Sequence, residues 1–415
     1  MRFGYKGLAL LIVVIGAAIA GGYSLGLKRS GQTAAPSGAA TTTGAGVVSP
    51  SSQLPANHPA LDDAAPLAGA PVDNRFTHFR VGSRNVKSLY LEDRYAWIGT
   101  SGGVIRYDLT TDQHQIFDNK IPGLLSNGVF HVSRLGDRIA VGTYGGGLSL
   151  YDPAKGSWKN YNIPQGLADQ FVYDVVQASN GDVWIATWSG ANRVRQGRFD
   201  DPKQWSTFTV ENTDGGLPNR WVYSIAEGPD GAMWFATEEG LARYRDGQWR
   251  NWKHSDGLGA PYQQVKDSIK FTNDPGRASQ HHARNKAEQG LQDVNVAYNP
   301  NYIISLAVDR QGVVWCGTWG GGLARFDGNS WRNYTTKDGL PANHIFMLHQ
   351  DRGGRLWIGT NQGLASFNRA GSGFDVLTSR DGLFADNVFS MADAADGTMW
   401  LGSFGGVARI VRTGQ

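Results

Sequence analysis

The 415 residues carry a formal net charge of +3, only 18% of them are charged, and glycine accounts for 56 positions. Four basic residues (Arg2, Lys6, Lys28 and Arg29) flank one apolar segment, so 35 basic residues face 36 acidic ones elsewhere. This balance excludes the basic footprint of a nucleic-acid-binding protein. The single cysteine, Cys316, excludes an intramolecular disulfide, a haem-attachment motif and a cysteine-based zinc site.

The N-terminal segment contains an uncharged, apolar stretch at residues 7–27, which is long enough to span a bilayer as a helix. A cleavable secretory signal is the alternative, because Arg2 and Lys6 precede the stretch and Ala18-Ile19-Ala20 follows its most apolar part. The apolar stretch continues to Leu27, which favours an uncleaved anchor over residues 1–29. We therefore expect a single pass through a bacterial inner membrane and a periplasmic C-terminal part, although positive charge on both flanks sets the orientation only weakly.

Residues 30–73 consist mainly of alanine, threonine, serine, glycine and proline. Such a segment cannot bury enough apolar surface to offset its loss of conformational entropy, so it is predicted to be a disordered linker.

From Asn74 onward, one pattern recurs: an apolar strand ends in Gly-Thr or a close variant, and a glycine-rich turn leads into the next strand. Successive copies start 43, 44, 50, 81, 42 and 43 residues apart. Their first residues are Trp97, Ala140, Trp184, Trp234, Trp315, Trp357 and Trp400. Seven copies at this period predict an all-β fold, a seven-bladed β-propeller over residues 74–415.

Each copy resolves into four short strands, and the sixth shows the template at residues 345–350, 355–360, 364–367 and 374–377. The seventh copy ends near Ile410 with too few residues left for a fourth strand, whereas an unassigned strand pattern occurs at 76–79, before the first copy. We expect this N-terminal strand to complete the last blade and so to close the ring.

The 81-residue interval contains about forty residues more than one repeat, and they fall at 259–301, between the fourth and fifth copies. A short helix is predicted over 278–291 and a turn at Asn299-Pro300-Asn301. An insertion of this length in a compact fold is more often functional than not.

The repeats resemble the two-component regulator propeller repeat, whose pattern is a GL…N.V lead-in followed by an LWIGT…GGL.RYD core. Here Gly339 to Ile345 supply the lead-in, and Trp357 to Thr360 supply the core. The resemblance implies the periplasmic sensor of membrane-spanning hybrid histidine kinases, often responding to glycans. The chain has seven repeats rather than a doubled set and no segment that resembles a kinase, so ligand or partner binding is the implied role.

Propellers bind on the face that carries the loops after the Gly-Thr strand ends. Four of the seven residues that follow Gly-Thr are aromatic, and we expect them in solvated loops, where flat rings can stack on sugars or anchor a protein. The adjoining loops supply polar side chains. The predicted binding residues are Tyr144, Trp188, Trp319, Phe404, Asn127, Arg220, Asn343, His344 and Asn387. Alternatively, the rings pack against neighbouring loops and the asparagines cap turns.

No catalytic or metal-binding motif and no cofactor site emerge from the sequence. His254, His281 and His282 lie on or near the insertion, but a solvated loop is favoured over a metal site there. A lyase of the streptogramin-degrading type also uses a propeller, and its required His/Glu pair could come only from Glu238, Glu239 and His344. The preferred interpretation is not an enzyme but a membrane-anchored periplasmic propeller that binds a protein partner as scaffold or accessory subunit of a bacterial envelope complex. A sensor for a glycan-type ligand is the alternative.

Overall fold

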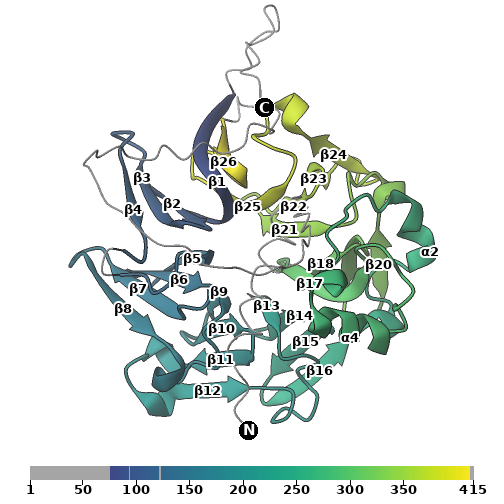
Figure 1. Cartoon of the computed structure of the whole chain (residues 1–415), viewed down its shortest axis with the longest axis horizontal. Coiled ribbons are helices and arrows are strands. Elements are labelled where there is room, and N and C mark those ends of the chain that lie inside the picture. The colour runs from purple at the N-terminus through teal and green to yellow at the C-terminus, as the bar shows by residue number, and fades with distance from the viewer. Residues whose placement is uncertain (1–74, 93, 121–122, 412–415) are drawn as a thin grey trace, which may run out of the picture. The chain divides into compact units, whose positions relative to one another are not determined.

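The computed structural model describes residues 75–92, 94–120 and 123–411. Within them, the strands form six antiparallel sheets, which are the blades of an all-β propeller (Figure 1). The predicted membrane-spanning segment and linker lie outside the described residues. No helix in the described part of the chain is long and apolar enough to cross a membrane.

The first blade has six strands in the order β25 (Val388–Asp393), β26 (Met399–Ile410), β1 (Phe76–Leu91), β2 (Tyr95–Thr100), β3 (Gly103–Asp108) and β4 (His114–Phe117). The next two blades consist of β5 (Val129–Leu135), β6 (Arg138–Thr143), β7 (Leu148–Asp152) and β8 (Ser157–Tyr161), then β9 (Val172–Gln177), β10 (Val183–Thr187), β11 (Gly190–Val194) and β12 (Trp205–Phe208).

The fourth blade consists of β13 (Val222–Glu227), β14 (Met233–Thr237), β15 (Gly240–Arg245) and β16 (Gln248–Trp252). The last two consist of β17 (Asn299–Val308), β18 (Val314–Trp319), β19 (Leu323–Phe326) and β20 (Trp331–Tyr334), then β21 (Ile345–Gln350), β22 (Leu356–Thr360), β23 (Gly363–Phe367) and β24 (Phe374–Leu377).

Helices are short. The insertion contains α2 (Tyr262–Val265), α3 (Pro275–Ala278) and α4 (Gln280–Glu288). The 3-10 turns are η1 (Ile163–Gln165), η2 (Arg195–Gly197), η3 (Pro202–Gln204), η4 (His254–Asp256), η5 (Lys266–Ser268), η6 (Thr336–Asp338) and η7 (Ser379–Asp381). Thus the predicted helix in the insertion is present as α4. The predicted turn at residues 299–301 lies at the start of β17, where the Asn299 side chain accepts from the amide of Asn301 and the pairing with β18 skips from Asn299 to Ile303.

The prediction of seven blades is wrong, because the described strands form six sheets. The reason is that β1 and β26 each run without a break. The first part of β1 pairs with β26, from Phe76 opposite Ile410, and its second part pairs with β2, from Val86 opposite Thr100. The first and seventh sequence repeats therefore share one hydrogen-bonded sheet. The expected pairing of the N-terminal strand with the C-terminal strand is present.

The first strand of each repeat lines the axis (Figure 1), and each of these seven strands carries a bulge, where the pairing register shifts. A bulge re-aims the extra side chain. The bulged residues are Lys87, Phe130, Tyr173, Tyr223, Ile304, Phe346 and Phe389. The aromatic residues and Ile304 among them belong to one apolar cluster, so the inner strands converge on an aromatic axis. Lys87 lies 4.1 Å from the Phe130 ring centroid, and burial lowers its pKa to about 7.

Candidate functional site

Hydrogen bonds explain why the repeats end a strand in Gly-Thr. The hydroxyl of Thr318 donates to the carbonyl of Gly322 at 2.7 Å, and Thr360 donates to Gly363 at 2.9 Å in the same way. A glycine is also needed in the turn that follows the threonine, because Gly322 has φ +79° and a Cβ there would lie 2.2 Å from the carbonyl of Tyr334. The threonine closes the loop in this way in six of the seven repeats, and Ser403 takes its place in the seventh.

The four aromatic residues at these loops do not lie in solvent as expected. Trp319 is 1% exposed and Trp188 is 8% exposed, while Tyr144 and Phe404 are half-buried against the same apolar cluster. Trp188 packs edge-on against Phe171 at a centroid distance of 4.6 Å. The neighbouring loops and the insertion bury these rings because aromatic side chains gain most when water is removed from both faces.

The predicted polar residues divide into two groups. Asn343 and His344 are each 2% exposed and lie under the insertion, where the Nδ2 of Asn343 donates to the hydroxyl of Ser268 at 2.8 Å. By contrast, Arg220 is exposed and pairs with Glu211 at 3.0 Å. The remaining two, Asn127 and Asn387, are half-buried in loops of other repeats. The nine predicted residues therefore do not form one open surface.

His344 is held in its neutral form. Its Nε2 donates to the carbonyl of Ala297 at 2.7 Å, and Phe271 from the insertion packs on its ring at 4.8 Å. A carbonyl oxygen only accepts, so this contact assigns the hydrogen to Nε2. Burial lowers the pKa of His344 to about 4, against the opposing effect of the bond to Ala297.

The insertion is itself well anchored. Ser279 caps the start of α4 by accepting a hydrogen bond from the amide of His282. Lys286, on the same helix, is 6% exposed and donates to Asp274 and to the carbonyls of Val294 and Val296 at 2.7, 2.7 and 3.2 Å. A buried ammonium ion needs such a set of partners to offset its lost hydration. The segments on both sides of α4 are thereby tied together.

A buried carboxylate holds α4 on the ring. Glu238, the residue that follows the last residue of β14 in the fourth repeat, is 0% exposed. One carboxylate oxygen contacts His282 Nδ1 and accepts from Asn285 Nδ2 at 2.9 Å, and the other lies 3.3 Å from His281 Nε2. Burial by itself raises the pKa of Glu238, but the two histidines outweigh it and hold the pKa at about 2.

This cluster corrects the expectation of a solvated loop at His281 and His282. His282 is 3% exposed, and His281 stacks on Trp221 with ring centroids 3.8 Å apart. Glu238 is paired with these histidines rather than with His344, so the pairing considered for a lyase is absent from the described residues. No group of three or more potential ligand side chains able to hold a metal ion occurs among the described residues.

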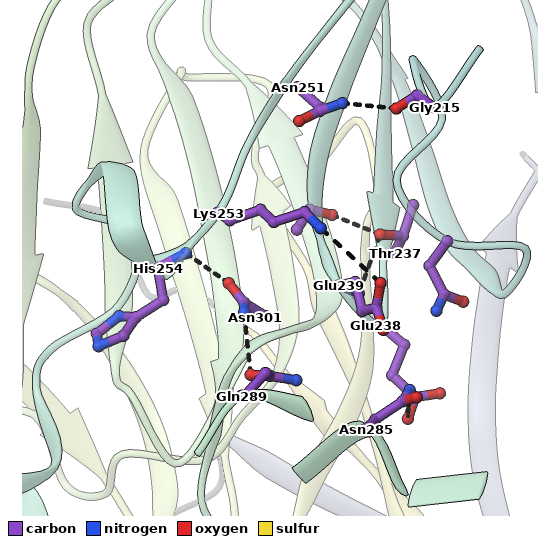
Figure 2. Close-up of polar contacts among 12 residues, drawn as sticks. Gly215, Thr237, Glu238, Glu239, Asn251, Lys253, His254, Asn285, Gln289 and Asn301 are labelled. Atoms are coloured by element: carbon purple, nitrogen blue, oxygen red, sulfur yellow. Dashed lines mark hydrogen bonds and ion pairs between the residues drawn. The ribbon is translucent and has the colours of Figure 1, made fainter. Parts of the chain in front are cut away.

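A pocket of about 460 Å³ opens beside this cluster, between the end of α4 and the loops of the fourth repeat. Figure 2 shows several of its side chains around Glu239, which directly follows Glu238. The lining residues are Glu239, Lys253, His254, Ser255, Glu288, Gln289, Leu291, Pro300 and Asn301. The two adjacent glutamates thus have different tasks, because Glu238 secures the insertion and Glu239 lines the pocket.

The polar groups of the pocket are partly fixed by one another. Asn301 accepts from the amide of His254, and its Nδ2 donates to Gln289 Oε1 at 2.9 Å (Figure 2). Lys253 Nζ lies 3.9 Å from a carboxylate oxygen of Glu239, which is too long for a strong hydrogen bond. Burial raises the pKa of Glu239, and the opposing effect of Lys253 is smaller. Gln289 Nε2 has no hydrogen-bond partner among the described residues.

Sequence reasoning missed this pocket. The sequence did contain a signal. The fourth repeat carries Glu238 directly after the threonine that ends its second strand, where four other repeats carry an aromatic residue. The insertion also carries the adjacent histidines His281 and His282. Their pairing joins residues 44 positions apart, from Glu238 to His282. Only the folded arrangement of the insertion brings them together.

Four segments of the chain match the family model of the two component regulator propeller, at residues 166–189, 216–239, 297–320 and 339–362. No curated protein matches the chain. Among solved structures, the chain is similar to the extracellular domain of the putative hybrid two component system BT3049 from B. thetaiotaomicron, with a TM-score of 0.61 and 16% identity, covering 81% of this chain and 41% of that one.

Two further structures have the same fold. The extracellular domain of the putative one component system BT4673 from B. thetaiotaomicron gives a TM-score of 0.57 at 19% identity, covering 81% of this chain and 40% of that one. A streptogramin B lyase gives a TM-score of 0.54 at 13% identity, and the match covers 80% of this chain and 96% of the lyase. The chain spans about two fifths of the length of the two B. thetaiotaomicron structures. These likenesses show the fold alone, whereas four segments of the propeller match the two component regulator propeller model.

Proposed function

We propose that this propeller is a ligand-binding domain of the sensor type and that it binds a small, hydroxyl-rich ligand in the pocket beside α4. The observation that carries the proposal is the concave pocket of about 460 Å³, built by the insertion on the ring. Binding sites for small ligands are concave, largely pre-formed and lined by a few convergent polar groups. The hydrogen bond between Asn301 and Gln289 and the buried contact of Glu238 with His282 on α4 fix the pocket walls, which supports a pre-formed site.

The charges of the pocket favour a particular ligand chemistry. Glu288 is paired with Arg284 at 2.7 Å, whereas Glu239 lies 3.9 Å from Lys253, so Glu239 is the carboxylate of the pocket with more capacity left for a ligand. Leu291 and Pro300 add apolar surface for the C–H groups of a sugar ring. A glycan-type ligand, which the resemblance implies, fits these groups, and a ligand with an amino group gains a charge-assisted bond to a carboxylate.

A scaffold for a protein partner is supported less well. Such a role needs a broad exposed apolar surface. Among the described residues, the exposed large hydrophobic side chains are only Leu125, Ile163 and Val411. The buried aromatic loop residues, Trp188 and Trp319, cannot anchor a partner without rearrangement of the loops around them.

Isothermal titration calorimetry with three matched sugars tests the proposal. Glucosamine carries an amine, N-acetylglucosamine is neutral and glucuronate is anionic, so affinity should fall in that order. Glu239→Gln should weaken glucosamine about tenfold, the loss expected for one charge-assisted bond. Glu211→Gln is the matched control, because Glu211 is exposed and pairs with Arg220 outside the pocket. Saturable binding that Glu239→Gln leaves unchanged would contradict the assignment of the pocket.

The pH dependence of binding gives an independent test. The pKa of Glu239 is raised above its usual value of 4.5 by burial, so the carboxylate takes up a proton at a higher pH than an exposed glutamate does. Glucosamine affinity should therefore weaken as the pH falls through that raised pKa. The Glu239→Gln variant should lack this dependence, and an identical pH profile in both proteins would reject the contact.

We further propose that residues 7–27 hold the protein in a bacterial inner membrane, with the propeller in the periplasm. The uncharged apolar stretch motivates this proposal. Protease added to spheroplasts should digest a C-terminal tag on the full-length protein. Protection of the tag until the membrane is permeabilised would contradict the orientation.

A further inference from the structure

A second cavity, of about 550 Å³, lies at the other end of the strands, away from the Gly-Thr loops. It opens between the β5–β8 blade and the β9–β12 blade, where the β5–β6 hairpin faces the connection from β11 to β12. Its apolar part consists of four buried side chains: Leu135, Leu150, Val183 and Phe199. A concave site with a buried apolar floor is a typical setting for a small organic ligand.

The connection that shapes this cavity is held in one conformation. It contains η2 and η3, and Gln196 within η2 adopts φ +52°, a left-handed conformation that is unfavourable for a residue with a Cβ. The amide of Gln196 donates to Asp182 at 3.0 Å, and its Nε2 donates to the carbonyl of Asn180 at 2.6 Å. These bonds offset the strain and keep the connection in place, so the cavity is pre-formed.

Phe199, in the same connection, is turned inward to form part of the floor. Its ring contacts Tyr161 at a centroid distance of 5.1 Å and Trp205 at 5.7 Å. Trp205 Nε1 also donates to the carbonyl of Phe199 at 3.0 Å. The floor is therefore fixed from two neighbouring blades.

The acidic residues of the rim are largely occupied by the protein itself. Asp200 pairs with Lys159 and accepts from the hydroxyl of Tyr161 at 2.9 Å. Asp201 caps η3, accepting from the amide of Lys203 and from Gln204 Nε2, both at 3.0 Å. A carboxylate that already accepts such bonds has less capacity left for a cationic ligand.

Two arginines on the rim are placed differently. Arg138 lies 3.9 Å from Asp137, whose side chain is 87% exposed, so this contact is weak. Arg198 is exposed and forms no ion pair within 4 Å among the described residues. Guanidinium groups match the geometry of carboxylates and other oxyanions, and they retain this capacity when their contacts are weak. The remaining acid on the rim, Asp137, is largely solvated.

We propose that this cavity binds a small organic anion, with its apolar body on the floor of Leu135, Leu150, Val183 and Phe199 and its acidic group on Arg138 and Arg198. An aromatic or short alkyl carboxylate or sulfonate is the class of ligand that satisfies both parts. This site shares no residue with the pocket beside α4, so it stands independently of the function proposed above.

Fluorescence titration of the full-length protein with 8-anilinonaphthalene-1-sulfonate, an aryl sulfonate, tests this site. Saturable binding at one site is expected. N-phenyl-1-naphthylamine, which has the same ring system without the sulfonate, should bind at least tenfold more weakly. The Arg138→Ala/Arg198→Ala double variant should weaken the sulfonate by about tenfold or more, because it removes charge-assisted bonds.

Arg369→Ala is the matched control, since Arg369 is an exposed arginine outside the cavity. It should bind the sulfonate like the wild type. The proposal is overturned if the double variant binds as tightly as the wild type, if the neutral analogue binds equally well, or if no saturable binding occurs. The double variant should bind glucosamine as tightly as the wild type does. A failure of the anion site can therefore be distinguished from a failure of the pocket beside α4.

Discussion

The repeats and the insertion are held in place by different kinds of side chain. In the repeats, the second strands such as β10, β14 and β22 are buried at every position, and most of those side chains are apolar. The insertion contacts the ring through the apolar side chain of Phe271 and also through a buried ion pair, in which Glu238 is 0% and His282 3% exposed. Its own segments are tied together by Lys286, which is 6% exposed. Apolar burial changes little with pH, whereas buried ion pairs depend on it. The ring should therefore withstand changes that release the insertion.

The largest expected effect comes from emptying the core of the ring. Phe235 is 0% exposed and packs against Trp184 and Trp249 at centroid distances of 5.5 and 5.3 Å. Phe235→Ala should lower the free energy of unfolding by about 4 kcal/mol, because the cavity collapses only partly. The midpoint of urea unfolding, followed by tryptophan fluorescence, measures this loss. A shift as small as that of an exposed site would mean that the ring tolerates loss of its core.

A change at Glu238 should act on the insertion and spare the ring. Glu238→Ala leaves His281, His282 and Asn285 without their shared acceptor, and breaking a buried charged cluster destabilises the docked state by about 3 kcal/mol. Hydrogen exchange should accelerate about 100-fold at the amides of α4 and stay unchanged in β10. Glu239→Ala is the neighbouring control, with a smaller effect expected. Equal acceleration in β10 and α4 would show that the insertion and ring unfold together.

Mild acid should lower the stability of the protein through His344, which lies where the insertion covers the ring. The pKa of His344 is lowered from 6.5 to about 4, so the unfolded chain binds a proton more readily than the folded protein, and stability falls as the pH drops from 6.5 towards 4. Between pH 7 and pH 5 the loss should be about 2 kcal/mol. His344→Gln can still donate to Ala297 and should remove this part of the pH dependence. An unchanged pH profile of thermal unfolding in that variant would exclude His344 as its source.

The smallest effect concerns a single loop of the ring. Thr360→Val preserves the shape of the side chain but removes the hydroxyl that donates to the carbonyl of Gly363. The same hydroxyl accepts from the amide of Gln362 at 3.0 Å, so the substitution removes two neutral hydrogen bonds and the loss should be about 1–2 kcal/mol. Thr272, which is exposed in the insertion, gives a control substitution to valine. If thermal unfolding of both variants equals that of the wild type, the threonine hydroxyl contributes nothing measurable.

The sequence predicted the parts of this fold that depend on local patterns. The strand at residues 374–377 coincides with β24, and the N-terminal strand pairs with β26, because period-two patterns and missing strands are visible in the chain itself. Counting Gly-Thr motifs could not reveal that β1 and β26 run continuously and merge two repeats into one sheet. The start of β17 at Asn299 was likewise not predicted, because it depends on pairing with the distant Trp319, while the local turn preference survives in the bond from the amide of Asn301 to the Asn299 side chain.

The site depended far more on contacts between distant residues. Aromatic residues after Gly-Thr were recognised, but their burial results from packing against other loops and against Phe271 of the insertion. His281 and His282 are polar and adjacent, which suggests a solvated loop when taken alone. The burial of His282 and the half-burial of His281 become favourable because Glu238 supplies a compensating charge from another segment of the chain.

Replacement of residues 261–296 by a short glycine-serine linker tests the central claim most directly, namely that the insertion is a separately docked element that builds the ligand pocket on an autonomous ring. The bordering residues are both attached to the ring: the amide of Ala260 donates to Gly321 at 2.9 Å, and the carbonyl of Ala297 accepts from His344. Thermal unfolding first checks that both the replaced and the wild-type protein are folded. Glucosamine binding to each is then measured by calorimetry. The account predicts a cooperative unfolding transition in both proteins and glucosamine binding only in the wild type. Retained binding in the replaced protein, or loss of its folded ring, would contradict it.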